Sequence, residues 1–132
     1  MQTSLKNFIL VLVVGLVTAA RATAAESDPE IVLVTYHVKA GKTDELAKLI
    51  DQTWAIYRRL GLVFDKPHII MRGKEEGGVF FAEILPWKSH SASDHAPAEV
   101  RALWDQMEFL CERRSDRDTI EIPEVEILRN NS

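Results

Sequence analysis

The sequence contains few of the residues on which several common chemistries depend. Its one cysteine, Cys111, excludes an internal disulfide and any paired-cysteine metal site. The chain has no lysine or arginine run and a formal net charge of −4, so it is a poor candidate for binding nucleic acid. It also has no glycine-rich phosphate loop and no serine nucleophile elbow, which argues against nucleotide and serine-hydrolase chemistry.

The amino-terminal segment has the pattern of a secretory signal peptide. Lys6 precedes an apolar run over residues 8–17, and the small residues Ala22 and Ala24 suit signal peptidase. An uncleaved membrane anchor is the alternative, but the run is shorter than the roughly 20 residues that span a bilayer. We expect cleavage after Ala24 and an exported protein, periplasmic or secreted, that has no membrane contact after cleavage. The mature chain would keep 108 residues and a net charge of −6.

The mature chain, residues 25–132, reads as one domain of alternating strands and helices. Apolar side chains recur every three or four residues after Thr43, a plausible N-cap, and again after Pro97, which predicts two amphipathic helices. Gly61 would end the first helix. β-Branched and apolar runs predict strands at residues 31–39, 67–73, 78–85 and 119–128, the last interrupted at Pro123. The first helix would cover residues 43–60, and a polar loop would occupy residues 87–96.

This order predicts a ferredoxin-like α+β sandwich with a core over residues 31–128. A βαββαβ chain with helices that are apolar on one side can place both helices on one face of a four-stranded antiparallel sheet. Alternation assigns one set of strand residues to the helix-covered face: Val32, Val34, Tyr36, Val38, Ile69, Met71, Phe80, Ala82 and Ile84. The other set would lie on an open face: Ile31, Leu33, Thr35, His37, His68, Ile70, Arg72, Val79, Phe81, Glu83 and Leu85.

The open face predicts a homodimer. An apolar sheet face of this size is not stable in water, and a second copy packing sheet to sheet would cover it. An exported domain without a disulfide also depends on its core or on oligomerisation for stability.

The chain resembles the dimeric α+β barrel superfamily, in particular its antibiotic-biosynthesis-monooxygenase-like domains. The resemblance covers about residues 31–128 and rests on three stretches: residues 36–42 (YHVKAGK), residues 81–84 (FAEI), and His95 before the second helix. It implies a dimer with a ligand pocket and, more weakly, an oxidation. Members include cofactor-free oxygenases, haem-degrading enzymes, isomerases and proteins of no known activity. The chain lacks a catalytic signature of any one of these groups.

The strongest catalytic candidates are His37, His68 and Glu83. If the hairpin turns within residues 74–77, His68 and Glu83 share a face, and His37 on the neighbouring first strand can approach Glu83. A carboxylate beside an imidazole could orient it as a general base, and Arg72 could hold an anionic substrate. The alternative is that these groups pair with one another, or with the second subunit, and set the dimer register.

Two further residues are candidate ligand contacts. The resemblance places a pocket-rim histidine near His95, and Trp87 could either rim a pocket or cap the core. His90, Asp94 and His95 lie close together, but their spacing matches no metal signature, so we expect a polar loop and no metal.

The remaining aromatic and sulfur side chains are expected in the core. Periodicity places Trp54, Trp104 and Cys111 on helix stripes, and Tyr36 on the helix-covered face. Two hypotheses stand together. The protein is a cofactor-independent monooxygenase-like enzyme with a small-molecule ligand, or it is a non-catalytic ligand-binding or interaction module. No cofactor is expected.

Overall fold

The computed structural model describes residues 28–129, and the predicted signal peptide lies outside this range. Its elements are β1 Glu30–His37, α2 Thr43–Arg59, β2 Ile69–Glu75, β3 Gly78–Trp87, α3 His90–Asp94, α4 Ala98–Phe109 and β4 Ile120–Glu121. None of the helices in the described range has the length and apolarity needed to cross a membrane.

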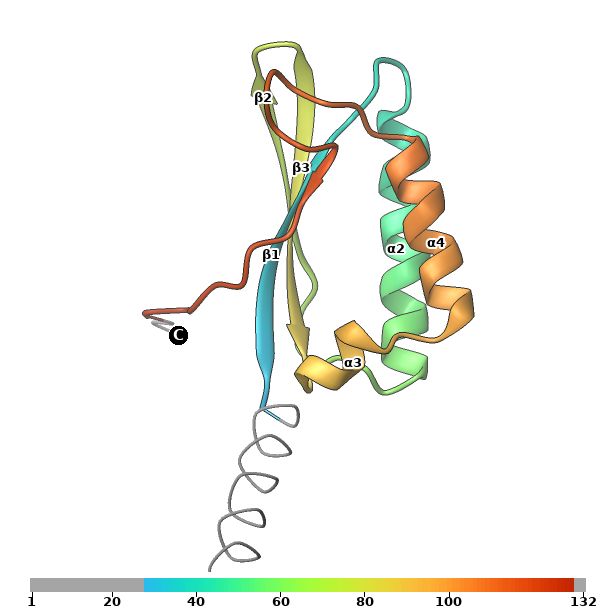
Figure 1. The fold of residues 1–132 in the computed structure, drawn as a ribbon, viewed down its shortest axis with the longest axis vertical. Coiled ribbons are helices and arrows are strands. Elements are labelled where there is room, and N and C mark those ends of the chain that lie inside the picture. Colours follow the sequence, from blue (N-terminus) through green and yellow to red (C-terminus); the bar gives the residue numbers. More distant parts are fainter. Residues whose placement is uncertain (1–27, 130–132) are drawn as a thin grey trace, which may run out of the picture.

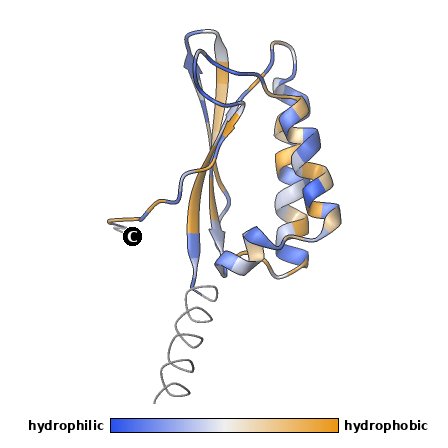
Figure 2. Cartoon of the chain, in the orientation of Figure 1, coloured by the Kyte–Doolittle hydropathy of each residue, from blue (hydrophilic) through white to orange (hydrophobic). Residues whose placement is uncertain are grey.

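The strands form one antiparallel sheet in the order β2-β3-β1-β4. Helices α2 and α4 lie side by side over one face of this sheet, and the other face has no helix (Figure 1). This confirms the predicted ferredoxin-like α+β fold. Apolar residues run along β1 and β3 and along parts of both helices (Figure 2), where the core forms between the two layers.

Helix α2 follows from its sequence pattern. Leu46, Ile50 and Tyr57 recur at helical spacing and are buried against the sheet. The helix ends before Gly61, whose φ of 68° is in the left-handed region that glycine tolerates best. The predicted Thr43 cap is wrong, because the N-cap position is Lys42 and no side chain caps the helix.

The predicted faces of the β2–β3 hairpin are reversed. Strand β1 pairs with β3 so that Val34 lies opposite Glu83, and Tyr36 opposite Phe81. Directly opposed residues share a face, so Glu83 and Phe81 lie under the helices. The error has a physical reason. Strand β3 is apolar on both faces, and alternation alone could not fix its orientation relative to β1.

Every residue of β2 and β3 therefore lies on the face opposite to the predicted one. The helix-covered face carries Ile70, Arg72, Phe81, Glu83, Leu85 and Trp87 beside Val32, Val34 and Tyr36. The open face carries Ile69, Met71, Phe80, Ala82 and Ile84 beside Ile31, Leu33, Thr35 and His37.

Two further differences between the predicted and the observed elements lie in the second half of the chain. The predicted loop over residues 87–96 contains the short helix α3, which Ser89 caps through a bond from the Ala92 N–H. The predicted strand over residues 119–128 reaches ladder geometry only at Ile120–Glu121. After Pro123 the chain bonds β1 once more, from the Val125 N–H to the Ile31 carbonyl, and then leaves the sheet on the side away from the helices (Figure 1).

Candidate functional site: a cleft between the sheet and helix α4

A cleft of about 840 Å³ lies on the helix-covered side of the sheet. Its volume is within the range of small-molecule sites. Its lining includes Val32, Val34 and Tyr36 of β1, Leu85 and Trp87 of β3, and Tyr57 of α2. Strand β4 is the edge strand beside β1, and Thr119, Ile120 and Ile122 of this edge segment also line the cleft.

A buried polar triad reaches the cleft through Tyr36. The Tyr36 hydroxyl donates to Glu83 Oε2 at 2.6 Å, and His68 Nε2 lies 2.7 Å from Glu83 Oε1. The His68 ring stacks on Trp54 of α2 at 4.3 Å between centroids, with 5° between the planes. Glu83 is only 2% exposed, so both carboxylate oxygens depend on these two partners. We call Tyr36, Glu83 and His68 the buried triad.

Burial sets the protonation state of the two cleft tyrosines. Desolvation, followed by the nearby Glu83 charge, raises the pKa of Tyr36 well above its usual value. Burial also raises the pKa of Tyr57, against a smaller opposing effect of its hydrogen bond from Trp104. Both phenols are therefore protonated at neutral pH. Tyr36 can pass a proton on, but it is not a resident phenolate base.

Three residues that line the cleft, Tyr57, Trp87 and Trp104, form one aromatic cluster, which we call the aromatic wall. The Trp104 indole Nε1–H donates to the Tyr57 hydroxyl at 2.5 Å. Trp87 contacts the Tyr57 ring at 4.9 Å and the Trp104 ring edge to face at 6.2 Å. These contacts fix the three rings against one another, which leaves a preformed aromatic surface.

The rim of the cleft is acidic. We call its carboxylates the acidic rim: Glu30, Asp94, Asp105, Glu108 and Asp118. The one cation among the described residues that line the cleft is Arg113, which lies 3.9 Å from Asp118. Negative charge therefore exceeds positive charge around the opening.

One group at the rim has donors of the kind that hold a metal ion. Ligand atoms of Glu30, His90 and Glu124 lie within 4.8 Å of one another. His90 turns Nδ1 toward Glu30 at 3.6 Å and Nε2 toward Glu124 at 3.8 Å. A metal would need one ring nitrogen and both carboxylates to converge. The observed geometry is that of a histidine bridging two carboxylates.

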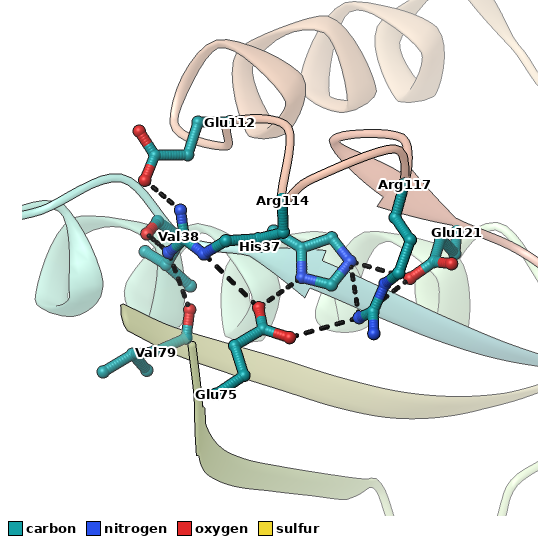
Figure 3. A network of polar contacts seen from close by, with 8 residues as sticks. All are labelled: His37, Val38, Glu75, Val79, Glu112, Arg114, Arg117 and Glu121. Atoms are coloured by element: carbon teal, nitrogen blue, oxygen red, sulfur yellow. Dashed lines mark hydrogen bonds and ion pairs between the residues drawn. The ribbon is translucent and has the colours of Figure 1, made fainter. Parts of the chain in front are cut away.

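His37 lies on the opposite face of the sheet from the cleft. Its Nδ1 is 2.5 Å from Glu75, and its Nε2 is 2.7 Å from Glu121 and 3.1 Å from Arg117 (Figure 3). The predicted approach of His37 to Glu83 is therefore wrong. Consecutive strand residues point to opposite faces, and it is Tyr36, the residue before His37, that meets Glu83.

Arg114 extends the His37 network toward the hairpin. Its Nη2 donates to the Val38 carbonyl at 2.7 Å, its Nη1 contacts Glu112, and its Nε lies 3.4 Å from Glu75 (Figure 3). That last contact is close enough for an ion pair but is not directed as a hydrogen bond. The network ties the segment after α4 to β1 and to the end of β2, so its visible role is to hold these segments together.

The other sequence-derived candidates lie in the buried triad, in the cleft lining or at the surface. His68 and Glu83 share a face and are hydrogen-bonded, as predicted. Trp87 lines the cleft and is also only 2% exposed. Arg72 and His95 are exposed and do not line the cleft.

Sequence reasoning missed the two tyrosines as functional residues. Alternation predicts a core position for Tyr36, Tyr57 lies at helical spacing with Leu46 and Ile50, and both tyrosines are buried. The available signal was their hydroxyl groups, since a buried tyrosine needs a hydrogen-bond partner. With the hairpin faces assigned correctly, Glu83 would have been the diagonal neighbour of Tyr36 across β1 and β3.

No protein-family model matches the chain, and no curated protein is significantly similar to it. Solved structures are similar. One is a mutant of SnoaB, a cofactor-independent oxygenase from Streptomyces nogalater, with 16% identity, a TM-score of 0.58, and coverage of 78% of this chain and 96% of that one. This chain shares its fold.

Two further structures support the same fold. A candidate antibiotic biosynthesis monooxygenase from Caulobacter crescentus has 16% identity, a TM-score of 0.56, and coverage of 83% of this chain and 99% of that one. A dimeric ferredoxin-like protein from an uncultured marine organism has 13% identity, a TM-score of 0.50, and coverage of 80% and 96%. The fold is thus the one predicted from the resemblance to antibiotic-biosynthesis-monooxygenase-like domains.

Proposed function

We propose that this protein is an exported homodimer that oxygenates a small aromatic substrate without a cofactor, in the cleft between the sheet and α4. The observation that carries the proposal is the buried triad, which connects Tyr36, a residue that lines the cleft, to a carboxylate and an imidazole. The described cofactor-independent oxygenase of the same fold supports it. The predicted export fits the absence of a cofactor, since no ready supply of reduced nicotinamide is expected outside the cytoplasm.

The triad suits removal of a proton from a phenol or enol. A substrate hydroxyl can donate to the Tyr36 oxygen while Tyr36 passes its own proton to Glu83, which shares it with His68. The substrate anion that remains is electron-rich and reacts directly with dioxygen. For an enol whose keto form has a ring methylene, one oxygen atom ends as a carbonyl at that ring carbon. The other leaves as water with the hydrogen of that carbon and the proton first taken from the hydroxyl, so no external reductant is needed.

Oxygen uptake by the mature protein tests the activity. A panel of anthrones, hydroquinones and phenols is screened with an oxygen electrode, and products are identified by mass spectrometry with labelled dioxygen. Tyr36→Phe should lower turnover about 100-fold or more, in the range that a general acid–base group contributes. His95→Gln is the control, because His95 is exposed and outside the cleft.

Turnover that is equal in Tyr36→Phe and the parent protein would remove the triad from the mechanism. Absence of oxygen uptake across the panel would favour the second candidate function, a non-catalytic ligand-binding module. A specific observation favours that candidate: Tyr36 and His68 satisfy both oxygens of Glu83, so the triad can also be a structural element.

The homodimer would form through the open face. Ile69 and Met71 project from that face and are each 47% exposed in the single chain, and no helix covers them (Figure 1). A second copy would remove this apolar surface from water. Met71→Lys should give a monomeric mass by light scattering. Ile70→Lys is the matched control, because Ile70 is its neighbour on the helix-covered face. A parent protein that is monomeric at micromolar concentration would exclude the dimer.

Export follows from the amino-terminal pattern and has a direct test. The full chain, expressed in a bacterium with the secretion machinery, should yield a periplasmic or secreted protein whose mass and first residue, Ala25, fit cleavage after Ala24. An intact mass in the cytoplasmic fraction would contradict it.

A further inference from the structure

We infer that the cleft selects a phenolic amine, a ligand with an oxygen on an aromatic ring and a protonated amine at its other end. The inference rests on the proposed function in that it takes the same cleft as the site. It adds the chemical class of the ligand and its orientation.

The charge of the cleft opening is the first argument. Of the acidic rim, Asp94, Asp105 and Glu108 form no salt bridge with any other residue in the described range, and all three are exposed. Arg113, the one cation among the described lining residues, already pairs with Asp118. Several carboxylates around one opening attract a cationic ligand and repel an anionic one. A carboxylated substrate would meet this repulsion at the rim.

The hydroxyl of Tyr57 is the second and independent argument. Tyr57 is 2% exposed and lines the cleft, and its oxygen accepts the Trp104 indole N–H. Its own proton has no acceptor among residues 28–129. A buried hydroxyl that keeps an unused donor at a cleft wall is suited to a ligand oxygen. The acceptor must lie on the aromatic part of the ligand, because the donor is within the aromatic wall.

The two features also give the ligand a direction. The ring lies against the aromatic wall with its oxygen toward Tyr57, and the amine extends to the acidic rim. Together these contacts distinguish the amine end from the ring end.

Isothermal titration calorimetry on the mature protein with four small probes measures the contributions of the ammonium group and of the ring hydroxyl to binding. Tyramine has both the ring hydroxyl and the ammonium. Tyrosol replaces the ammonium by a neutral alcohol, hydroxyphenylacetate replaces it by a carboxylate, and phenethylamine lacks the ring hydroxyl. Tyramine should bind about tenfold more tightly than tyrosol, and hydroxyphenylacetate should bind most weakly. Added salt should weaken tyramine binding and leave tyrosol binding unchanged.

Two variants test whether the acidic rim recognises the ammonium group and whether Tyr57 recognises the ring hydroxyl. Asp105→Asn combined with Glu108→Gln should remove the preference of tyramine over tyrosol. The matched control is Asp44→Asn combined with Glu76→Gln, which removes the same charge from exposed positions outside the cleft. Tyr57→Phe should weaken tyramine about fivefold and leave phenethylamine unchanged.

Equal or tighter binding of hydroxyphenylacetate, a preference that survives the rim variant, or no binding of any probe would each overturn the inference. These outcomes leave the oxygenase proposal to its own test, because binding is measured without turnover. Tight tyramine binding, with no oxygen uptake for any member of the oxygenase screening panel, would keep the ligand class and favour the non-catalytic module.

Discussion

Tyr36 and Glu83 are diagonal neighbours across β1 and β3, and the tyrosine hydroxyl donates a 2.6 Å hydrogen bond to the glutamate. Tyr36 is 3% exposed and Glu83 2%, so neither has ready access to water as a substitute partner. An unpaired buried carboxylate oxygen is costly. The pair therefore contributes to stability whether or not it takes part in catalysis.

Tyr36→Phe should lower the free energy of unfolding by about 1–3 kcal/mol, because it leaves Glu83 Oε2 without its donor. Tyr57→Phe should cost less, since the Trp104 indole N–H that it releases belongs to a partly exposed side chain. Urea unfolding followed by circular dichroism measures both. A smaller loss for Tyr36→Phe than for Tyr57→Phe would contradict the importance of the Glu83 contact.

Alkaline pH should destabilise the fold through the same tyrosines. Tyr36 and Tyr57 are the two tyrosines of the chain, and burial raises the pKa of each in the folded state. Above the unfolded pKa of about 10, the unfolded chain loses protons that the folded chain keeps. Stability is therefore fully present below about pH 10 and falls as the pH rises toward the folded pKa values.

Ultraviolet absorbance of tyrosinate measures this directly. No tyrosinate should form until the protein unfolds, and its appearance should coincide with loss of the circular dichroism signal. Tyr36→Phe should make the fall in stability with pH shallower. Tyrosinate absorbance that appears near pH 10 in a protein that is still folded would show that the hydroxyls are accessible.

Cys111 should be unreactive in the folded protein. It is 2% exposed, and burial raises the pKa of its thiol to about 12, against smaller effects of nearby charges. The thiolate is the reactive form, so a disulfide reagent at pH 8 should label it only after guanidinium unfolds the chain. Rapid labelling of the native protein at that pH would contradict its burial.

The sequence predicted the order of the strands and the two long helices, and with it the fold, because both long helices carry clear periodic stripes and the end of the first has a recognisable signal. Gly61 is one such signal, and its positive φ is observed. The sequence did not predict which face of β3 meets the helices. Phe80 and Phe81, like Ile84 and Leu85, are apolar neighbours that point to opposite faces. The two faces of β3 are therefore equally apolar at these positions, and alternation could not show which face meets the helices.

The candidate site was predicted only in part, because the relation between β1 and β3 could not be derived from alternation. His68 and Glu83 were placed together correctly, since their relation depends only on the hairpin register. His37 was placed with them wrongly, since that step needed the relation between β1 and β3. The acidic rim combines residues from β1, α3, α4 and the segment before β4, which only the tertiary fold brings together.

Two neighbouring arginines give the last prediction. Arg114 is 7% exposed and donates to the Val38 carbonyl, with Glu75 and Glu112 as acidic partners. Arg113 is 64% exposed in its side chain, and its only ion pair in the described range is with Asp118 at 3.9 Å. Arg114→Met should lower the free energy of unfolding by about 2 kcal/mol, because it leaves the Val38 carbonyl without its donor and removes one of the cations beside Glu75.

Arg113→Met is the matched control, and it should change stability by no more than about 0.5 kcal/mol, as is usual for an exposed ion pair. Both values are measured by urea unfolding at the same protein concentration, so that a dimer affects them equally. If Arg114→Met also changes stability by less than about 1 kcal/mol, the network around His37 does not hold the segment after α4 to the sheet. If it unfolds the protein entirely, Arg114→Lys, which keeps the charge and loses the fork of donors, should recover part of the stability.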